Sequence, residues 1–343
     1  MSSTMLAARL DLTNGKLRME NIPIPEASRG EVRLKVEAAG ICLSDVHLLD
    51  GTLRMKPRGE ITQVTLGHEI AGVIDRVGEG VTHLKVGQRV LLHAGQTCGI
   101  CPQCLIGNPA RCMRLLVRGV DYDGGWAEYA VARQDTVAVV PDELPIEQAA
   151  ILPDAVSTPY AALLETAALR PAESVGLWGI GGLGAHAVQI ARIMGAAPIL
   201  AFDLLPEARE RALALGADAA FDPRQENLRT EVRRLTGGAG LDVALDLAGV
   251  TAARAQAQSV LAPYGRLVLV GINPEPTTIN HSVGFCATLQ QLRGHYGSRM
   301  EHLLQLIKLT RHKRLELSRS ISEVLPLAEA LIHDVEALAS SIT

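Results

Sequence analysis

The chain has 343 residues, enough for two domains, and its 48% hydrophobic and 20% charged residues are typical of a soluble globular protein. The net charge of −4 at pH 7 offers no basic footprint for nucleic acid, so we expect no nucleic-acid partner. No apolar run reaches the roughly eighteen residues of a membrane span, and residues 1–10 lack the apolar core of a signal peptide, so we expect a cytoplasmic protein without a membrane partner.

The first part of the chain is expected to be rich in β-strands. Residues 32–36 alternate apolar and polar side chains, which is the pattern of a half-buried strand. Four further short runs predict strands at 71–77, 89–92, 128–131 and 136–140. Short strands joined by glycine-rich turns predict a compact, barrel-like β domain.

The character of the sequence changes near residue 150. Residues 146–169 are rich in alanine and predict a helical segment, with Pro159 as a local break. Further on, short apolar runs predict strands at 174–180, 198–203, 218–221, 242–247 and 266–271. Amphipathic segments between them predict helices at 183–194, 207–215, 228–235 and 252–261. This alternation implies a doubly wound parallel sheet with helices on both faces.

The last part of the chain predicts a strand at 292–296 and helices at 300–309 and 325–338. The overall expectation is an α/β protein. It has a β-rich domain, a parallel-sheet domain and a C-terminal segment that returns towards the first domain, with boundaries at 1–153, 154–292 and 293–343.

Four cysteines lie close together in one loop. Cys98, Cys101 and Cys104 recur at intervals of three, and Cys112 follows after seven intervening residues. Four thiolates in so short a loop match a closed tetrahedral zinc site, although two disulfides or packed thiols are alternatives. Because nothing in the chain looks secreted, we favour the metal site. Cys286, in an apolar run, is expected to be a small core residue.

A glycine-rich turn follows the strand predicted at 174–180. Residues 179–184 fit G-x-G-x-x-G between a predicted strand and a predicted helix, which is the context of a dinucleotide-binding turn; a purely structural turn is the alternative. Such a turn brings a pyrophosphate close to the backbone at a helix N-terminus. Asp203 ends the next strand, where a carboxylate can bind ribose hydroxyls and repel a 2′-phosphate. Leu204 and Leu205 follow, so we predict NAD rather than NADP.

A second group of potential metal ligands is spread along the chain. Cys42, His68 and Asp154 supply a thiolate, an imidazole and a carboxylate, which suit a catalytic zinc site with an open position. Spacing alone does not link three residues so far apart in the sequence. A histidine such as His68 is also more often a satisfied polar residue than a ligand, so both interpretations stay open at this point.

In their order along the chain, these segments resemble the zinc-dependent medium-chain alcohol dehydrogenases. The resemblance covers almost the whole chain, and the joint match is specific although several segments are weak alone. It includes segment 40–47, Gly67-His68-Glu69, the cysteine loop, Gly124-Gly125-Trp126-Ala127-Glu128-Tyr129, segment 154–160 and the glycine turn. It implies a catalytic β-rich domain and a Rossmann cofactor domain.

The resemblance also implies two zinc ions per chain. Cys42, His68 and Asp154 would hold the catalytic zinc, with Asp154 standing where many relatives carry cysteine. The loop 98–112 would hold a structural zinc through its four cysteines. Glu69 would lie beside the catalytic metal, either behind its ligands or as an exchanging ligand.

By the same resemblance, Ser44 would hydrogen-bond the substrate oxygen, and His47 would pass its proton to solvent through the nicotinamide ribose. The implied NAD contacts, including a candidate arginine in the segment 294–299, are Thr158, Gly179, Gly181, Gly182, Leu183, Gly184, Asp203 and Arg299.

The implied activity is reversible hydride transfer between NAD and a primary or secondary alcohol, giving an aldehyde or ketone. A polyol or amino-alcohol dehydrogenase of the same family is the alternative. A zinc-free reductase would lack the cysteine loop, and a non-enzymatic zinc- and nucleotide-binding protein would be expected to lose Ser44 or His47. We expect a homodimer or homotetramer, as is common in bacterial relatives.

Overall fold

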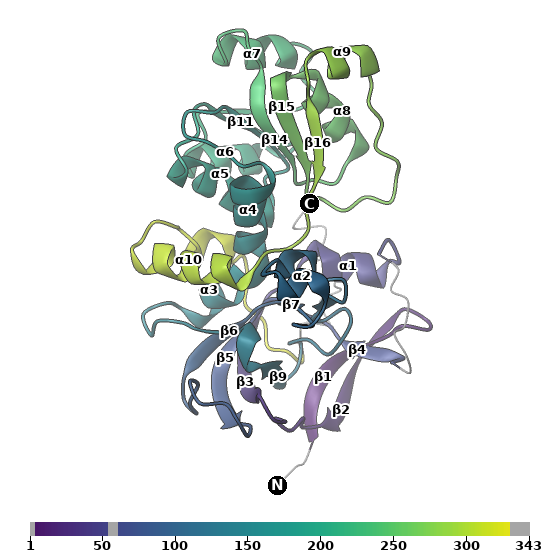
Figure 1. Cartoon of the computed structure of the whole chain (residues 1–343), viewed down its shortest axis with the longest axis vertical. Coiled ribbons are helices and arrows are strands. Elements are labelled where there is room, and N and C mark those ends of the chain that lie inside the picture. The colour runs from purple at the N-terminus through teal and green to yellow at the C-terminus, as the bar shows by residue number, and fades with distance from the viewer. Residues whose placement is uncertain (1–3, 54–60, 330–343) are drawn as a thin grey trace. The chain divides into compact units, whose positions relative to one another are not determined.

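The computed structural model describes residues 4–53 and 61–329 of the chain. The chain forms two compact units: one holds the residues up to Ser157 and those from Gly297 onward, and the other holds Thr158–Tyr296 (Figure 1). The predicted fold class, a β-rich unit plus a doubly wound parallel sheet, is confirmed. The domain boundaries expected after residues 153 and 292 each lie four residues before the observed ones.

The larger sheet of the first unit has five antiparallel strands in the order β10-β6-β5-β3-β9. All five predicted strands are present, as Glu31–Ala39 (β3), Ile70–Val77 (β5), Arg89–Leu92 (β6), Tyr129–Arg133 (β9) and Val137–Val139 (β10). The alternation that predicted β3 places Val32 and Leu34 in a core with Ile70 and Ile74. Burial of such side chains, worth about 25 cal/mol per Å² of apolar surface, holds the sheet together.

A second sheet of this unit, in the order β2-β1-β4, was not predicted from the sequence. Its strands are Thr4–Asp11 (β1), Lys16–Pro23 (β2) and Gln63–Thr65 (β4). The neighbours Ala7 and Ala8 on β1 are both buried, so this strand is covered on both faces and lacks strict apolar–polar alternation. A bridge between Ala7 and Ala127 ties β1 to the chain just before β9.

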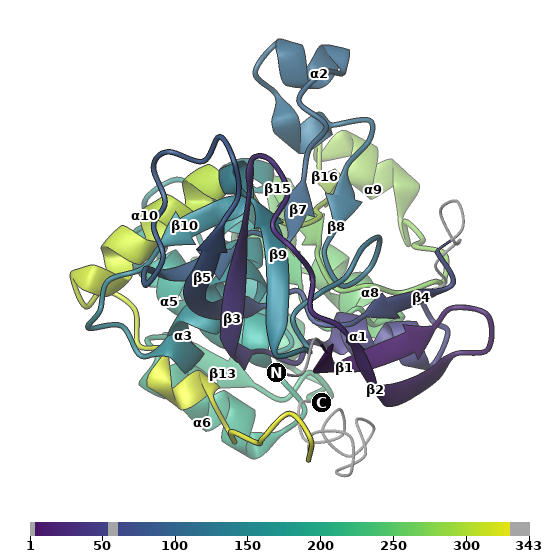
Figure 2. The ribbon, with the colours of Figure 1, turned by 90° about the horizontal axis from the view of Figure 1, so that it is seen from below.

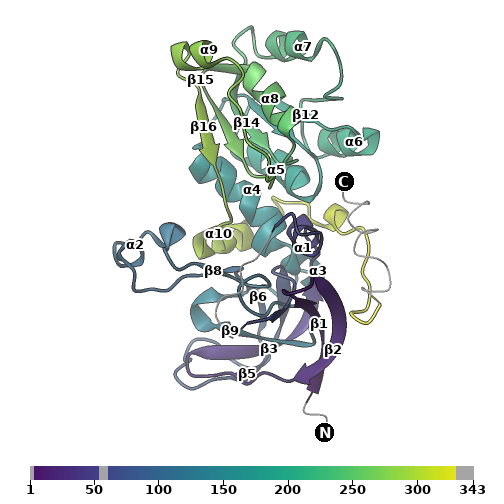
Figure 3. The ribbon, with the colours of Figure 1, turned by 90° about the vertical axis from the view of Figure 1, so that its right-hand side faces the viewer.

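Short elements lie in the loops of the first unit. They are α1 (Leu43–Leu49), β7 (Gly95–Gln96), α2 (Pro102–Leu105), η1 (Pro109–Arg111), β8 (Leu116–Val117), η2 (Gln134–Thr136) and η5 (Ser318–Ser320). This unit also holds the longer helix α10 (Met300–Arg311). Figures 2 and 3 both show the loop with α2 standing out from the rest of this unit. The helix predicted at 300–309 is confirmed as α10. Of the helix predicted at 325–338, residues 325–329 are not helical, and the rest lies outside the described residues.

The alanine-rich segment is helical, but its irregularity differs from the prediction. It runs through Ile146–Ala150 (α3), Leu152–Val156 (η3), Ser157–Ala161 (α4) and Ala162–Thr166 (η4), in which η3 and η4 are π-helical. Pro159 lies inside α4, so the predicted break at this residue is wrong, and the wider turns lie on either side of it. π-helical turns occur frequently at functional positions. Asp154 lies in η3, which makes this turn relevant to the site.

The sheet of the second unit has six parallel strands in the order β13-β12-β11-β14-β15-β16. The predicted strands are all present, as Val175–Trp178 (β11), Ile199–Phe202 (β12), Ala219–Phe221 (β13), Leu241–Asp246 (β14), Leu261–Leu269 (β15) and Gln291–Gly294 (β16). The strand order reverses between β11 and β14. Ligands of such sheets bind at this reversal, beyond the carboxyl ends of the strands.

Helices link the strands of the second unit. They are α5 (Gly182–Ile193), α6 (Pro206–Ala214), α7 (Leu228–Leu235), α8 (Thr251–Ser259) and α9 (Ser282–Ala287). Because crossovers between parallel strands are right-handed as a rule, this strand order places α5 and α6 on one face of the sheet and α7 and α8 on the other. Among the residues that the structure describes, none of the helices combines the length and the apolar character needed to cross a bilayer.

The expectation that Cys286 is a core residue is wrong. Cys286 lies exposed on α9, not in the core. Its apolar neighbour Val283 is also 75% exposed, so this apolar run forms a short surface helix.

The third glycine of the turn is required by close packing. A Cβ on Gly184 would lie 2.0 Å from the carbonyl oxygen of Gly179, whereas a Cβ on Gly182 would meet nothing within 4 Å. We expect Gly184→Ala to destabilise the protein by about 1–3 kcal/mol, because the backbone of the turn must move. Gly182→Ala, at the start of α5, should be neutral or slightly stabilising. Thermal denaturation of both variants checks this, and equal melting temperatures would contradict the packing.

Candidate metal and cofactor sites

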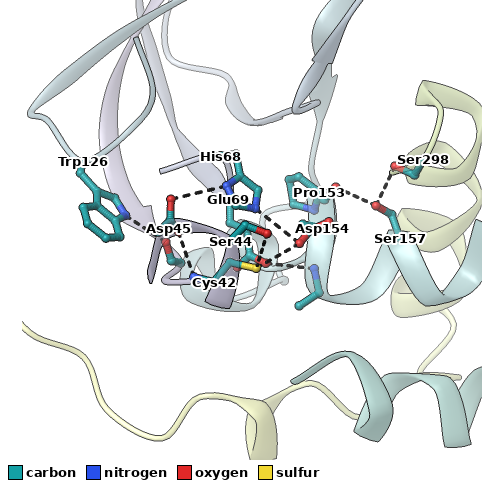
Figure 4. A network of polar contacts seen from close by, with 12 residues as sticks. Cys42, Ser44, Asp45, His68, Glu69, Trp126, Pro153, Asp154, Ser157 and Ser298 are labelled. Atoms are coloured by element: carbon teal, nitrogen blue, oxygen red, sulfur yellow. Dashed lines mark hydrogen bonds and ion pairs between the residues drawn. The ribbon is translucent and has the colours of Figure 1, made fainter. Parts of the chain in front are cut away.

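The structure brings together the three predicted ligands of the catalytic metal (Figure 4). Cys42 precedes α1, His68 lies just before β5, and Asp154 lies on the π-helical turn η3. One donor atom from each of these residues and from Glu69 lies within 4.8 Å of the others. All four residues belong to the first unit.

The distances between donor atoms fit a metal ion of the size of zinc. The Sγ of Cys42 and the Nε2 of His68 each lie 3.4 Å from the Oδ2 of Asp154. Zinc–ligand bonds of about 2.0 Å to nitrogen or oxygen and 2.3 Å to sulfur imply tetrahedral edges of about 3.3 and 3.5 Å. The His68–Asp154 distance exceeds that of an ordinary N–H···O hydrogen bond, so it matches a shared cation better than a direct contact.

The charges around these donors also favour a cation. Burial, and then the charge of Asp154, raise the pKa of Cys42 to about 11 and that of Glu69 to about 8. Burial alone would lower the pKa of His68, but the carboxylates of Asp45 and Asp154 raise it well above its ordinary value. Acidic groups thus crowd around one imidazole in a buried place. A divalent cation would stabilise their ionised forms and take the place of the retained protons.

Asp45 supports two of these donors and was not singled out in the sequence. It is fully buried, and its Oδ2 accepts a hydrogen bond of 3.0 Å from the backbone N–H of Cys42. Its Oδ1 lies 3.7 Å from the Nδ1 of His68. At this distance the carboxylate acts on the ring through its charge; in metal sites, a carboxylate that accepts a hydrogen bond from a ligating histidine fixes the orientation of the ring and its tautomer. The position of Asp45, three residues after Cys42, was the only sequence signal for this role.

Glu69 is held at the edge of the donor group. Its Oε1 accepts a hydrogen bond of 2.9 Å from the N–H of Ala155, the residue after Asp154. A Cβ on Gly40 would lie 2.0 Å from its Oε2, so the carboxylate fills space that only glycine leaves open. Glu69 therefore links the loop before α1, the start of β5 and the turn η3.

Ser44 and His47 lie on α1, three residues apart and so on one face of the helix. The Oγ of Ser44 is 3.6 Å from the Sγ of Cys42. The Nδ1 of His47 is 3.8 Å from the Oδ2 of Asp50, and the side chain of His47 is 25% exposed. Of the two side chains, that of Ser44 lies beside the donor group and that of His47 lies next to Asp50, the exposed residue that follows α1.

The four cysteines of loop 98–112 also converge. The Sγ of Cys101 lies 3.5 Å from that of Cys104 and 4.0 Å from that of Cys112, which is 3.6 Å from the Sγ of Cys98. Zinc–sulfur bonds of about 2.3 Å imply edges of about 3.8 Å, whereas a disulfide requires about 2.05 Å. All four thiols are free, so the disulfide alternative does not hold in this structure.

Backbone N–H groups point at these sulfurs. The N–H of Cys101 donates to the Sγ of Cys98, and the N–H groups of Cys98 and Arg114 donate to the Sγ of Cys112, each at 3.4 Å. Backbone hydrogen bonds from Cys104 and Met113 lower the pKa of Cys101. These contacts favour the thiolate form, which binds metal, at Cys98 and Cys101, whereas burial and the neighbouring thiols raise the pKa of Cys104 to about 12.

The glycine turn and Asp203 meet in the second unit. The Oδ2 of Asp203 accepts a hydrogen bond of 2.6 Å from the N–H of Ile180, and its Oδ1 accepts one of 2.9 Å from Leu205. Each carboxylate oxygen keeps a further lone pair for a ribose hydroxyl. The guanidinium of Arg209 lies nearby and donates to the carbonyl oxygens of Asp203 and Leu204 at 2.8 Å.

The two remaining predicted cofactor contacts lie on different units. Thr158 is buried in α4 and belongs to the second unit, with the glycine turn. Arg299 precedes α10 in the first unit, with its guanidinium 3.5 Å from Glu301. Their predicted contacts with a cofactor stay predictions.

Known proteins resemble both units. Residues 28–142 match the alcohol dehydrogenase GroES-like domain, and residues 182–310 match the zinc-binding dehydrogenase domain. An alcohol dehydrogenase of Geobacillus stearothermophilus is 38% identical over 80% of this chain and 80% of its own length. A sorbitol dehydrogenase of Bacillus subtilis is 34% identical over 79% of this chain and 76% of its own length. The crystal structure of the alcohol dehydrogenase of Aeropyrum pernix superposes with a TM-score of 0.87 at 30% identity, covering 98% of this chain and 97% of that one.

Proposed function

Because the chain belongs to the zinc-dependent medium-chain alcohol dehydrogenase family, we propose that it interconverts an alcohol and an aldehyde or ketone with NAD(H). The observation that carries this proposal is the convergence of the donor atoms of Cys42, His68 and Asp154 at zinc-like separations. Three protein ligands leave a tetrahedral ion one open position, which is the catalytic arrangement. The four-cysteine loop would hold a second, structural zinc.

The residues of the site in the first unit have separate roles. Zinc, when bound, supplies a Lewis acid that polarises the substrate oxygen and lowers its pKa. Asp45 orients the imidazole of His68, and Glu69 holds the turn that carries Asp154. The chain itself therefore fixes the ligands, while the nicotinamide accepts or gives the hydride.

Ser44 and His47 would carry the proton that the oxidation of an alcohol releases. The hydroxyl of Ser44 would accept the proton of the substrate hydroxyl and hand on its own. His47, on the same face of α1, would take a proton on its imidazole and release it to solvent. For reduction of a carbonyl compound, the same groups would deliver the proton in the reverse order.

Asp203 is proposed to select NAD. We expect Asp203→Ser to shift the ratio of NAD to NADP affinity towards NADP by at least about 10-fold. The variant removes the negative charge of Asp203, which would repel the 2′-phosphate of NADP. It leaves the Arg209 guanidinium, which would attract that phosphate, next to position 203. Asp218→Ser is a matched control, because Asp218 also binds a strand N–H, that of Ile199, but precedes β13 at the amino end of the sheet. An unchanged ratio in Asp203→Ser would contradict the role.

The substrate class is tested by following NADH absorbance with a panel of primary alcohols, secondary alcohols, polyols and amino alcohols. Oxidation of simple alcohols supports the proposal, and absence of NAD reduction with every class contradicts it. A polyol dehydrogenase is the second candidate, favoured by the similarity to the sorbitol dehydrogenase. Preferred oxidation of polyols over matched monoalcohols would establish it.

We also propose a cytoplasmic homo-oligomer. The six free cysteines suit a reducing compartment. Strand β16 forms an edge of the parallel sheet, and such edges pair readily with another chain.

A further inference from the structure

Trp126 contacts both segments that carry the thiolate and imidazole donors, and Figure 4 shows it to one side of them. The residue is only 7% exposed. Its backbone N–H donates to the carbonyl of Leu66 at 2.9 Å, and its carbonyl accepts from the N–H of Ala8 at 2.8 Å. The main chain therefore holds Trp126 in place, and its large side chain has no part in the proposed reaction.

The indole ring lies close to the backbone just before His68. A Cβ on Gly67 would come within 2.3 Å of the ring, and Gly67 has a φ of +89°, so two separate constraints require glycine there. The N–H of Gly125 donates to the carbonyl of Gly67 at 2.9 Å. The indole ring and the hydrogen bond from Gly125 thus hold Gly67, the residue before His68, in place.

The same ring reaches the loop that leads to Cys42. Its Nε1–H donates to the carbonyl oxygen of Gly40 at 3.0 Å. The N–H of Gly40 in turn donates to the carbonyl of Glu69 at 2.9 Å, which extends the pairing of β3 with β5. The indole therefore connects the segment before Cys42 with the segment before His68, beyond the last residue pair of β3 and β5.

We propose that Trp126 is a positioning residue that sets the separation between Cys42 and His68, and thereby the affinity of their site for its metal. Without the indole N–H, the carbonyl of Gly40 would lose this donor and the loop before α1 would be free to shift. The inference rests on the proposed function in one respect, namely that this site binds zinc. It adds a residue that touches neither the metal nor the substrate.

The test compares Trp126→Phe with Trp178→Phe. Phenylalanine keeps a ring against Gly67 but has no N–H donor. Trp178, the only other tryptophan, is stacked on Phe202 in the second unit with a centroid distance of 4.1 Å, so its replacement is a matched control. With cobalt at the catalytic site, we expect a chelator to remove it about 10-fold faster from Trp126→Phe. The cobalt–thiolate absorption band should also shift in this variant and stay unchanged in Trp178→Phe.

A second measurement leaves Trp126 in place, so it tests the role of Trp126 even if Trp126→Phe does not fold. In Trp178→Phe, Trp126 is the remaining tryptophan, and its emission should change when the catalytic metal is removed and recover when it is restored. Unaltered emission, or cobalt retained equally in Trp126→Phe and wild type, would overturn the inference. Failure of the wild-type protein to bind metal at Cys42, His68 and Asp154 would instead defeat the proposed function.

Discussion

Replacing His68 by alanine should abolish turnover while NAD binds as tightly as in the wild-type protein. The variant removes the Nε2 donor that lies 3.4 Å from Asp154 and leaves the buried acidic groups without an imidazole. The catalytic zinc should then be lost or misplaced. We expect kcat to fall by at least about 10²–10³-fold, the usual cost of losing one electrostatic group that stabilises the transition state. The glycine turn and Asp203 lie in the second unit and keep their geometry.

Zinc content and NAD affinity should be measured on the same samples. His93→Gln is a suitable control, because His93 is also buried in the first unit but its ring contacts the carbonyls of Gly95 and Ser298. This control should keep both zinc ions, whereas His68→Ala should keep one. Full activity in His68→Ala would show that the imidazole is not a ligand.

Replacing Cys104 by serine should remove the structural zinc and destabilise the loop around it. The sulfur of Cys104 is 3.5 Å from that of Cys101, and serine is a poor substitute for a thiolate ligand. The loop exposes Ile100, Leu105 and Ile106, so little apolar burial would hold it without metal. We expect one zinc ion fewer per chain and a melting temperature lower by about 5–10 °C.

Cys286→Ser is the matched control for this variant. Cys286 is exposed on α9, away from either group of ligands in the sequence. The control should keep two zinc ions and the wild-type melting temperature. If Cys104→Ser also kept two zinc ions, the four-thiolate site would be wrong.

The features predicted best from the sequence are those whose residues lie close together along the chain. Strand β3 was predicted from its alternation of apolar and polar residues, and β11 and β14 from short, bounded apolar runs. The four cysteines and the glycine turn were found because each chemical group is complete within a few residues. Strand β1 was missed because it buries side chains on both faces, so the period of two is lost.

The catalytic group could not be assembled from the residues alone. Asp154 lies 112 residues from Cys42 and 86 from His68, and only the folded β-rich unit brings them together. The resemblance to a family supplied this link. Asp45 and Trp126 lie within the segments that carry that resemblance, but the sequence does not predict their roles, because these contacts involve backbone groups that a pattern of side chains does not show.

Zinc-edge anomalous diffraction from crystals of the wild-type protein tests the central claim most directly. Two peaks per chain are predicted. One should lie about 2.0–2.3 Å from the Sγ of Cys42, the Nε2 of His68 and an oxygen of Asp154, and the other should lie among the four thiolates of loop 98–112. A chain whose only peak lies in that loop, with Cys42, His68 and Asp154 binding no ion, would contradict the account.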